Sequence, residues 1–267
     1  MITVAAVQTN PLFGEIHNNC KRANELISSV SAHLFVLPEL FNTGYLFEDR
    51  NQLISMAESY PNGPTTEFLA NLSKKTNSVI AGGIAELSPE GKVYNSAVIC
   101  DRGQPLVCYR KIHLFSTEKL IFDAGDLPPQ VISSSIGRLG PMICFDWIFP
   151  ETARTLALGG AQILVHCANL VMPYCQDAMV TRTIENRVFA VTANRIGTET
   201  QGGESLTFTG GSQITSLNGL RLGRGSLDRE EVVITRIDPG LADDKLLNPM
   251  NHLFDDRRPG FYGKIVE

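Results

Sequence analysis

Hydrophobic and polar residues alternate along the chain in blocks that predict helices and strands in turn. Over Asn18 to Ser31, apolar side chains recur every three or four positions, as on one face of a helix. The following residues, Leu34 to Leu37, form a continuous apolar run of strand length, and Pro38 then removes a backbone donor. We therefore expect an amphipathic helix followed by a buried strand, with Glu39 at the carboxyl edge of that strand.

The same alternation holds elsewhere along the chain, and residues 1–10 are expected to form a buried first strand. Further helices are expected over Thr65 to Thr76, from Pro150 to just before Gly159, and over Cys175 to Ala190. Further strands are expected at 79–84, 161–166, 191–194 and 232–237, and turn residues predict hairpins of 95–100 with 105–111, of 130–134 with 139–144, and around 218–219.

This order of elements predicts one α/β domain over residues 1–238, because strands and helices alternate and no linker divides them. Residues 239–267 remain as a tail that mixes apolar and charged side chains. It is too apolar for a solvated end and too short for a domain. We expect it to pack across a subunit boundary.

Composition changes this picture mainly by exclusion. With 43% hydrophobic and 19% charged residues the chain can bury a large core, which excludes a disordered or fibrous protein. A net charge of −5 offers no basic field, so neither nucleic acid nor an anionic membrane is an expected partner. No stretch has the uninterrupted apolar length of a membrane span.

The cysteines and the first residues suggest a location. The start of the chain lacks the cationic and apolar segments of a secretory signal, and the six cysteines form no CxxC pair. We expect free thiols in a reducing compartment, and hence a cytoplasmic protein.

Three chemically useful residues stand where predicted strands end. Glu39 follows the first of these strands, Lys111 ends a hairpin strand, and Cys144 ends another. Strand ends on a rigid sheet can aim side chains into one crevice. A cysteine nucleophile needs a base or a cation beside it, since few thiols are ionised at neutral pH. Glu39 could supply the base, and Lys111 the cation that also stabilises an oxyanion.

The sequence around each of these residues resembles a signature of the nitrilase superfamily of carbon-nitrogen hydrolases. The matching segments are Leu37-Pro38-Glu39-Leu40-Phe41, Tyr109 to Phe115, and Ile143 to Glu151, in the order and spacing of that family. The resemblance extends over residues 2 to about 237.

The resemblance implies a four-layer αββα sandwich with a catalytic triad of Glu39, Lys111 and Cys144. It implies that Glu118 is a second glutamate that orients the lysine, and that no metal or other cofactor takes part. It also implies subunit pairing into a homodimer or a higher even-numbered oligomer. The expected reaction is hydrolysis of a small linear carboxamide to acid and ammonia through a thioester on Cys144.

Several residues near the triad in sequence are candidates to bind the substrate. Trp147, the only tryptophan, has the alternative of packing under the neighbouring helix. No unassigned Arg or Lys is placed by the sequence to bind a substrate carboxylate, with Arg182 or Arg195 as the candidates for that role. A neutral amide is therefore favoured over an N-carbamoyl amino acid. A nitrile remains the nearest alternative, because thiolate addition to it leads to the same thioester. The candidates are Tyr45, Phe145, Trp147, Asn169, Met172 and Tyr174.

Other interpretations carry less weight. A non-catalytic regulatory protein need not keep a nucleophile with its base. A cysteine-protease arrangement of Cys144 with His166 leaves Glu39 and Lys111 unexplained, and His166 with Cys167 and Cys175 is too small a set for a metal.

Two pairs on the later helices have the spacing of structural ion pairs. These are Glu151 with Arg154, and Arg182 with Glu185. Pro141, in the strand before the nucleophile, indicates that this strand is unpaired or at an edge there.

Overall fold

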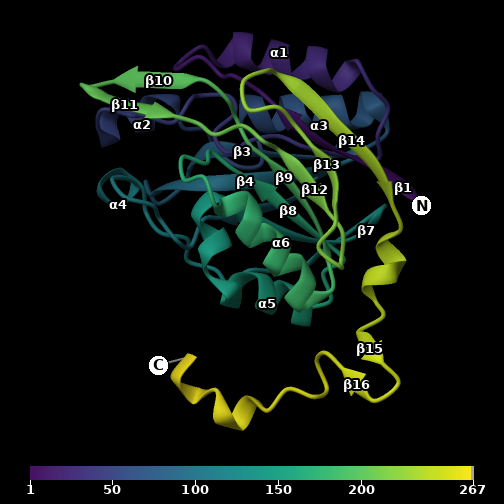
Figure 1. The fold of residues 1–267 in the computed structure, drawn as a ribbon. Coiled ribbons are helices and arrows are strands. Elements are labelled where there is room, and N and C mark those ends of the chain that lie inside the picture. The colour runs from purple at the N-terminus through teal and green to yellow at the C-terminus, as the bar shows by residue number, and fades with distance from the viewer. Residues whose placement is uncertain (266–267) are drawn as a thin grey trace.

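Two six-stranded sheets lie face to face in the computed structural model, which describes residues 1–265 (Figure 1). The first sheet has the order β14-β1-β2-β3-β4-β5 and the second the order β13-β12-β9-β8-β7-β6. The strands of the first sheet are β1 (Ile2–Gln8), β2 (Leu34–Val36), β3 (Val79–Leu87), β4 (Val93–Asp101), β5 (Gln104–Arg110) and β14 (Glu231–Ile237). Those of the second are β6 (Ile132–Ser134), β7 (Gly137–Ile143), β8 (Ile163–Cys167), β9 (Phe189–Ala193), β12 (Gln213–Thr215) and β13 (Arg221–Arg224).

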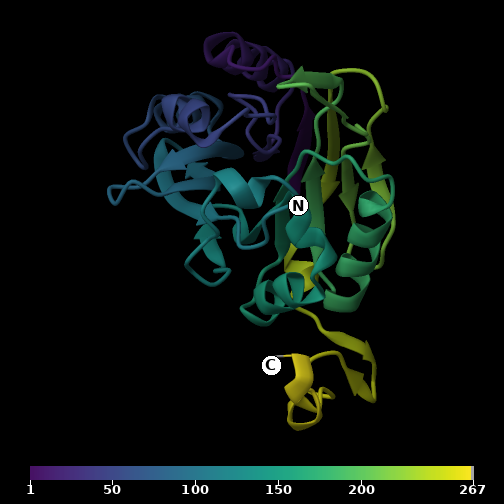
Figure 2. The same cartoon turned by 90° about the vertical axis from the view of Figure 1, so that its left-hand side faces the viewer.

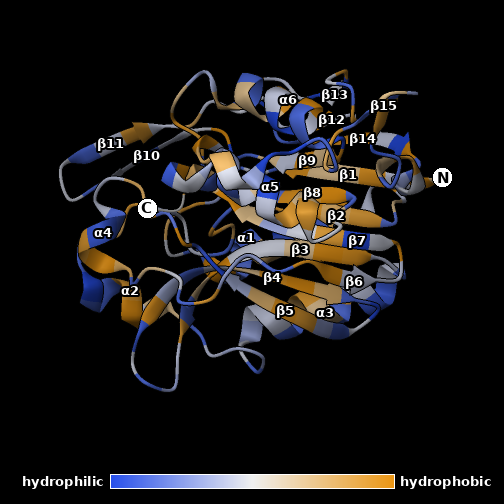
Figure 3. Ribbon diagram, turned by 90° about the horizontal axis from the view of Figure 1, so that it is seen from below, coloured by the Kyte–Doolittle hydropathy of each residue, from blue (hydrophilic) through white to orange (hydrophobic). Residues whose placement is uncertain are grey.

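Helices cover the outer face of each sheet. Figure 2 shows α1 (Ile16–Ser28) and α3 (Pro64–Thr76) outside the first sheet, and α5 (Pro150–Leu158) and α6 (Cys175–Asn186) outside the second. Shorter elements gather at the end of the sandwich opposite the N-terminus (Figure 3). They are α2 (Arg50–Met56), α4 (Glu118–Ile121) and a hairpin of β10 (Thr198–Gln201) with β11 (Glu204–Thr207).

Side chains of the central strands alternate between the two faces of the first sheet. Val4 and Ala6 belong to the core between the sheets, whereas Ala5 and Val7 belong to the core beneath α1 and α3. Strands buried on both faces read as continuous apolar runs, and Figure 3 shows these strands as mainly hydrophobic. The four-layer αββα arrangement that the family resemblance implies is thus confirmed.

Strand directions place several carboxyl ends at one edge. β1, β2 and β3 are parallel, and two antiparallel pairings from β3 through β4 to β5 return β5 to the direction of β2. In the second sheet β7, β8 and β9 are parallel. A parallel bridge between Thr9 and Arg195, just beyond β1 and β9, joins the two sheets at this same edge. The residues that follow β2, β5, β7 and β8 therefore meet there.

One predicted helix runs too far. The helix expected over Cys175 to Ala190 ends at Asn186, because Arg187 adopts a left-handed conformation with φ of 46° and closes the last turn. The buried residues that follow then form β9 from Phe189, two residues before the expected strand. A run of apolar residues is compatible with helix and strand alike, so periodicity did not separate them.

Pro141 lies on β7 beside β8, where it pairs with Val165. On the other side, β6 pairs only with residues 137–139, so that pairing ends before the proline. The missing N–H of Pro141 is accommodated in this way, as expected from the sequence.

The last residues leave the sandwich. After β14 the chain passes a short hairpin of β15 (Leu246–Asn248) with β16 (Asn251–His252) and runs below α5 and α6 (Figures 1 and 2). Lys245 anchors the start of this tail by donating to the backbone oxygens of Asn186 and Arg187, at 2.9 and 2.8 Å. Large apolar side chains beyond it are exposed, including Met250 at 85% and Phe261 at 77%.

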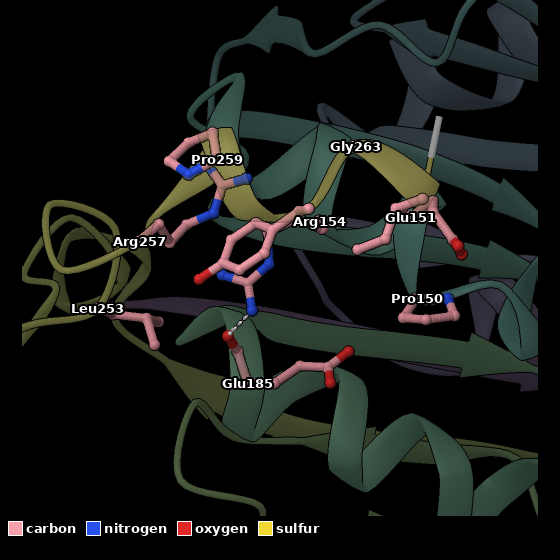
Figure 4. A pocket seen from close by; sticks show the side chains of 10 residues that line it. Pro150, Glu151, Arg154, Glu185, Leu253, Arg257, Pro259 and Gly263 are labelled. Carbon is pink, nitrogen blue, oxygen red and sulfur yellow. Dashed lines mark hydrogen bonds between the residues drawn. The ribbon is translucent and has the colours of Figure 1, made fainter. Parts of the chain in front are cut away.

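A pocket separates the tail from α5 and α6 (Figure 4). Arg154 points into it and donates to the backbone oxygen of Glu185 at 2.6 Å. The prediction of an ion pair between Glu151 and Arg154 is wrong, because the Arg154 side chain reaches α6 instead. The pair of Arg182 with Glu185 is confirmed at 2.8 Å. Within residues 1–265, every helix is too short or too polar to cross a membrane.

Candidate active site

Lys111 lies between two carboxylates at the shared strand edge. Its Nζ is 2.7 Å from Oε1 of Glu39 and 2.7 Å from Oε1 of Glu118. Glu39 and Lys111 are fully buried, and Glu118 is 3% exposed. Charges so well shielded from water interact strongly, and each must be paired. The three residues therefore form one charged cluster in a dry environment.

The backbone around Glu39 requires a close approach between neighbouring strands. Leu40 turns the chain with a φ of 47°. Gly83 of β3 packs against this turn, and a Cβ there would lie 2.5 Å from Cα of Glu39. Only glycine fits such a contact. On the other side, the backbone N–H of Lys111 donates to the oxygen of Asn95 at 2.8 Å, which fixes the lysine against β4.

The two oxygens of Glu39 have different surroundings. Oε1 accepts hydrogen bonds from Lys111 and from Nδ2 of Asn95, each at 2.7 Å. Oε2 is buried and has no hydrogen-bond partner among the described residues. Burial raises the pKa of Glu39, and the charge of Glu118 raises it further, although Lys111 opposes both. Glu39 thus has a free oxygen and the raised pKa of a general base.

The ammonium group of Lys111 stays charged. Burial lowers the pKa of Lys111, but Glu118 and Glu39 outweigh burial and raise that pKa above its ordinary value. The cluster accordingly holds a permanent cation, which is what a developing oxyanion needs.

Glu118 is held by two further donors. The hydroxyl of Tyr45 donates to Oε1 at 2.7 Å, and the backbone N–H of Phe115 donates to Oε2 at 2.9 Å. Burial raises the pKa of Tyr45 well above its ordinary value, and Glu118 and Glu39 add to this effect. The phenol therefore remains a donor, so that Glu118 keeps one orientation toward Lys111.

Cys144 follows β7 in a strained conformation. Its φ is 38°, a region that residues with a side chain rarely adopt, and the short 3-10 helix η1 (Cys144–Ile148) starts there. Its Sγ lies 3.7 Å from the backbone oxygen of Asn169. Burial raises the pKa of the Cys144 thiol well above its ordinary value, Glu39 raises it further, and Lys111 opposes them. The sulfur is therefore a thiol at rest and needs a base to become a nucleophile.

The side chains of Asp146 and His166 hold the backbone of the strained turn by hydrogen bonds. Asp146 accepts from the backbone N–H of Ile143 at 2.9 Å and from the hydroxyl of Tyr109 at 2.8 Å. His166 has its Nε2 3.0 Å from the backbone oxygen of Cys144. Burial lowers the pKa of His166 to about 4, so its imidazole is neutral near pH 7. His166 thus holds the backbone of Cys144, which is not the contact that a cysteine-protease base makes with its nucleophile.

A small pocket with a cavity volume of about 10 Å³ lies beside the sulfur. Four of the six residues proposed to bind substrate line it: Phe145, Trp147, Asn169 and Met172. The rest of the lining consists of Cys144, Phe115, Leu170, Val171 and Cys175.

The other two proposed substrate residues lie elsewhere. Tyr45 faces a separate cleft that Glu118 shares, formed with α2, α4 and the β10–β11 hairpin. Tyr174 is 53% exposed and packs edge-on against Trp147.

The arginines suggested as carboxylate ligands are engaged in structural contacts. Arg195 is 1% exposed and forms an ion pair with Glu199 at 2.6 Å. Arg182 donates from Nε to the backbone oxygen of Trp147 at 3.0 Å, in addition to its pair with Glu185. Both guanidinium groups are therefore occupied by contacts within the protein and are not free to bind a substrate carboxylate.

Some residues of the site were not anticipated from the sequence. Asn95 of β4 contacts Glu39 across β3, and no sequence motif marks it. Asp146 lies two residues after Cys144, within the segment that resembles the family signature, and this position in the sequence could have identified it as a site residue. His166 was considered only as a base or a metal ligand, because its contact with a backbone oxygen depends on the pairing of β7 with β8.

Comparisons with known proteins identify the family of this chain. A model of the carbon-nitrogen hydrolase family matches residues 3–244. A protein from Pyrococcus abyssi named nitrilase is 45% identical over 266 residues, covering 98% of this chain and 99% of its own. The 2-oxoglutaramate amidase of Bacillus subtilis is 30% identical over 269 residues, covering 97% and 99%. A solved carbon-nitrogen hydrolase from Helicobacter pylori G27 has a TM-score of 0.91 at 26% identity and covers 100% and 98% of the two chains. The chain therefore belongs to the carbon-nitrogen hydrolase family, within the nitrilase superfamily.

Proposed function

We propose that the protein hydrolyses a small neutral carboxamide to a carboxylic acid and ammonia, with Cys144 as nucleophile, Glu39 as base and Lys111 as the oxyanion-stabilising cation. The observation that carries this proposal is the buried cluster in which Lys111 Nζ lies 2.7 Å from both Glu39 and Glu118, at the strand edge that also holds Cys144. In this scheme Glu118 orients Lys111.

The first half of the reaction transfers the acyl group to sulfur. Glu39 takes the thiol proton on its free Oε2 as Sγ of Cys144 bonds to the amide carbon, and the carbonyl π electrons move onto oxygen. Lys111 and the backbone N–H of Phe145, in the first turn of η1, stabilise that oxyanion. Glu39 then returns the proton to nitrogen, and the C–N bond breaks. Ammonia departs, and the acyl group remains on Cys144 as a thioester.

The second half regenerates the enzyme. Glu39 takes a proton from a water molecule while the water oxygen bonds to the thioester carbon. The C–S bond breaks, the acid leaves, and the proton returns to sulfur. The raised pKa of Glu39 suits both directions of proton transfer, because a base that must also act as an acid works best near the working pH.

The surroundings of the site favour a neutral substrate. Arg182 and Arg195 are engaged by Glu185 and Glu199, and the pocket beside Cys144 is lined mainly by apolar side chains. A substrate carboxylate in that pocket would lack a cation to pair with. We infer that N-carbamoyl amino acids are poorer substrates than short amides.

A nitrile is the second candidate, and the relative named nitrilase at 45% identity favours it. Addition of the thiol to a nitrile gives a thioimidate, which water converts to the same thioester with loss of ammonia. The amidase named among the relatives is less similar, at 30%. The triad serves both reactions, so another residue must discriminate between them.

The experiment that tests the function measures ammonia release from matched amides, nitriles and N-carbamoyl compounds, with Cys144→Ala as control. We expect turnover of short amides, loss of that turnover in the variant, and a mass increase of one acyl group on the peptide containing Cys144 after rapid acid quenching. No turnover of any class by the unmodified protein would instead favour a regulatory, non-catalytic role.

We also propose that the tail after Lys245 packs on a second copy of the chain, giving a homodimer or a higher even-numbered assembly. The exposed Met250 and Phe261, and the pocket that separates the tail from its own α5 and α6, support this arrangement (Figure 4). The six free cysteines support a cytoplasmic location.

A further inference from the structure

Asn169 is fixed beside the nucleophile by its own backbone. It follows β8, and its backbone oxygen lies 3.7 Å from Sγ of Cys144. The residues on either side are anchored to the next strand, since Ala168 N–H donates to Ala193 at 2.9 Å and Leu170 N–H donates to Oδ1 of Asn194 at 2.8 Å. The position of Asn169 relative to the sulfur is therefore rigid.

The side chain of Asn169 is buried and unsatisfied at both ends. The residue is 2% exposed, and neither Oδ1 nor Nδ2 has a hydrogen-bond partner within residues 1–265. Asn42 and Asn95 are also buried, but each has its Nδ2 paired, with Thr65 and with Glu39. Because both ends of Asn169 are free, the conclusion holds whichever end is oxygen. A buried amide that lacks partners on both sides needs an explanation.

The pocket supplies that explanation. Asn169 lines the same pocket as Cys144, and all its other lining side chains are apolar, aromatic or sulfur-containing. Besides the nucleophile and the indole N–H of Trp147, which can only donate, Asn169 is the polar side chain that a ligand in this pocket meets. That side chain offers one acceptor and two donor hydrogens in a plane.

We propose that the Asn169 side chain pairs with the edge of the substrate's primary carboxamide and selects amides over nitriles. Oδ1 accepts an N–H of the substrate amide, and Nδ2 donates to its carbonyl oxygen. A primary carboxamide satisfies both ends at once. A nitrile nitrogen can only accept, so it leaves Oδ1 unpaired in a dry pocket. This inference rests on the proposed function and assigns its substrate class.

The pairing also follows the reaction forward. Nδ2 of Asn169 continues to donate as the carbonyl oxygen becomes an oxyanion. Once ammonia has left, the thioester has no N–H for Oδ1, so the pair is broken on the product side. Asn169 therefore favours the amide and its transition state over the acyl enzyme.

The test compares two substrates with the same carbon chain and two variants of the pocket. Propionamide and propionitrile are assayed with the unmodified protein, with Asn169→Leu and with Met172→Leu, a second pocket residue that offers no such pair. We expect Asn169→Leu to reduce kcat/KM for propionamide about 5- to 150-fold more than for propionitrile, the range expected for leaving a hydrogen bond unmade. Met172→Leu should shift both substrates in parallel. Thermal unfolding of each variant checks that the fold is retained.

A binding measurement separates this inference from the proposed function. Trp147 is the only tryptophan and lines the pocket, so its fluorescence reports occupancy in Cys144→Ala without turnover. We expect propionamide to bind Cys144→Ala more tightly than propionitrile, and the preference to disappear in Cys144→Ala/Asn169→Leu. Selective binding without turnover by the unmodified protein would remove the proposed function and keep the role of Asn169. The role is overturned if Asn169→Leu leaves the amide-to-nitrile ratio of kcat/KM unchanged and Cys144→Ala/Asn169→Leu leaves the ratio of binding affinities unchanged. A preference of the unmodified protein for the nitrile overturns it as well.

Discussion

The imidazole of His166 donates from Nε2 to the backbone oxygen of Cys144, over 3.0 Å. A carbonyl oxygen only accepts, so Nε2 carries the hydrogen, and Nδ1 accepts from Thr192 Oγ1 at 3.2 Å. This contact holds the backbone of a residue whose φ of 38° is rarely adopted by residues with a side chain. A neutral imidazole thus fixes the backbone of the proposed nucleophile.

This arrangement makes stability depend on pH. Burial lowers the pKa of His166 from 6.5 to about 4, so the unfolded chain takes up a proton at a higher pH than the folded protein does. The contribution of neutral His166 to the free energy of unfolding is complete above about pH 6.5 and is lost as pH falls toward 4. The total loss is about 3 kcal/mol. Urea denaturation at a series of pH values should show this loss. His166→Gln keeps a donor near the same oxygen and removes the titration, so the loss should shrink. An equal loss in both proteins would show that other groups cause it.

The raised pKa of Glu39 predicts the acid side of the activity profile. Burial makes Glu39 harder to ionise and raises its pKa; Lys111 opposes this effect, and the charge of Glu118 adds to it. Below its pKa the carboxyl is protonated and cannot accept the thiol proton. We expect kcat/KM to fall with decreasing pH at a value above the 4.5 of an ordinary glutamate. Glu39→Gln should reduce kcat at least 100-fold and should slow alkylation of Cys144 by iodoacetamide at pH 7. Alkylation at an unchanged rate would mean that the thiol ionises without Glu39.

Much of the fold could be predicted because its signals are local. The apolar run before Pro38 and the period of α1 each depend on neighbouring residues. The end of α6 could not be predicted, since it depends on the left-handed turn at Arg187. The four-residue α4 and the seven-residue α2 were missed because they are too short to show a helical period.

Some residues of the candidate site could likewise be predicted from the sequence, whereas their hydrogen-bond partners could not. Glu39, Lys111 and Cys144 each stand at a strand end, which a sequence displays. The partners of those residues come from pairing between distant strands, as when Asn95 of β4 reaches Glu39. Tyr174 follows the pocket residues in sequence, yet it lies on the surface, because proximity along the chain does not fix the direction of a side chain.

Replacing Lys111 should affect stability and activity together. Lys111→Met removes the cation between Glu39 and Glu118 and leaves two buried carboxylates facing one another. We expect a loss of about 3–5 kcal/mol in the free energy of unfolding, the range for breaking a buried ion pair, with the largest loss at high pH where both groups are charged. Denaturation at pH 5 and pH 8 measures this difference. Lys111→Met combined with Glu118→Gln should recover part of the stability without recovering activity, and an absence of recovery would contradict the repulsion.

Tyr45 should act through Glu118 and Lys111. The phenol donates to Glu118 at 2.7 Å, and Glu118 in turn accepts from Lys111 at the same distance. Tyr45→Phe removes one hydrogen bond to a charged group, worth about 1.5–3 kcal/mol, and should lower kcat by roughly 10- to 100-fold. Steady-state kinetics of Tyr45→Phe, Glu118→Gln and the double variant form a cycle. If the two effects simply add, Tyr45 does not work through Glu118.

The tail offers the last prediction. Met250 and Phe261 are 85% and 77% exposed, although the tail contacts its own subunit through Lys245 and through Phe254, whose ring lies 5.4 Å from the Arg154 guanidinium. If a second copy covers these side chains, Met250→Glu and Phe261→Glu should weaken self-association by roughly 30-fold or more, as expected for central interface residues. Sedimentation velocity over a range of concentrations measures the change. Leu12→Glu, at a side chain that is 59% exposed near α1, is the matched control and should leave association unaltered. A dimer that tolerates both tail substitutions, or a protein that is monomeric from the start, would show that the tail has another role.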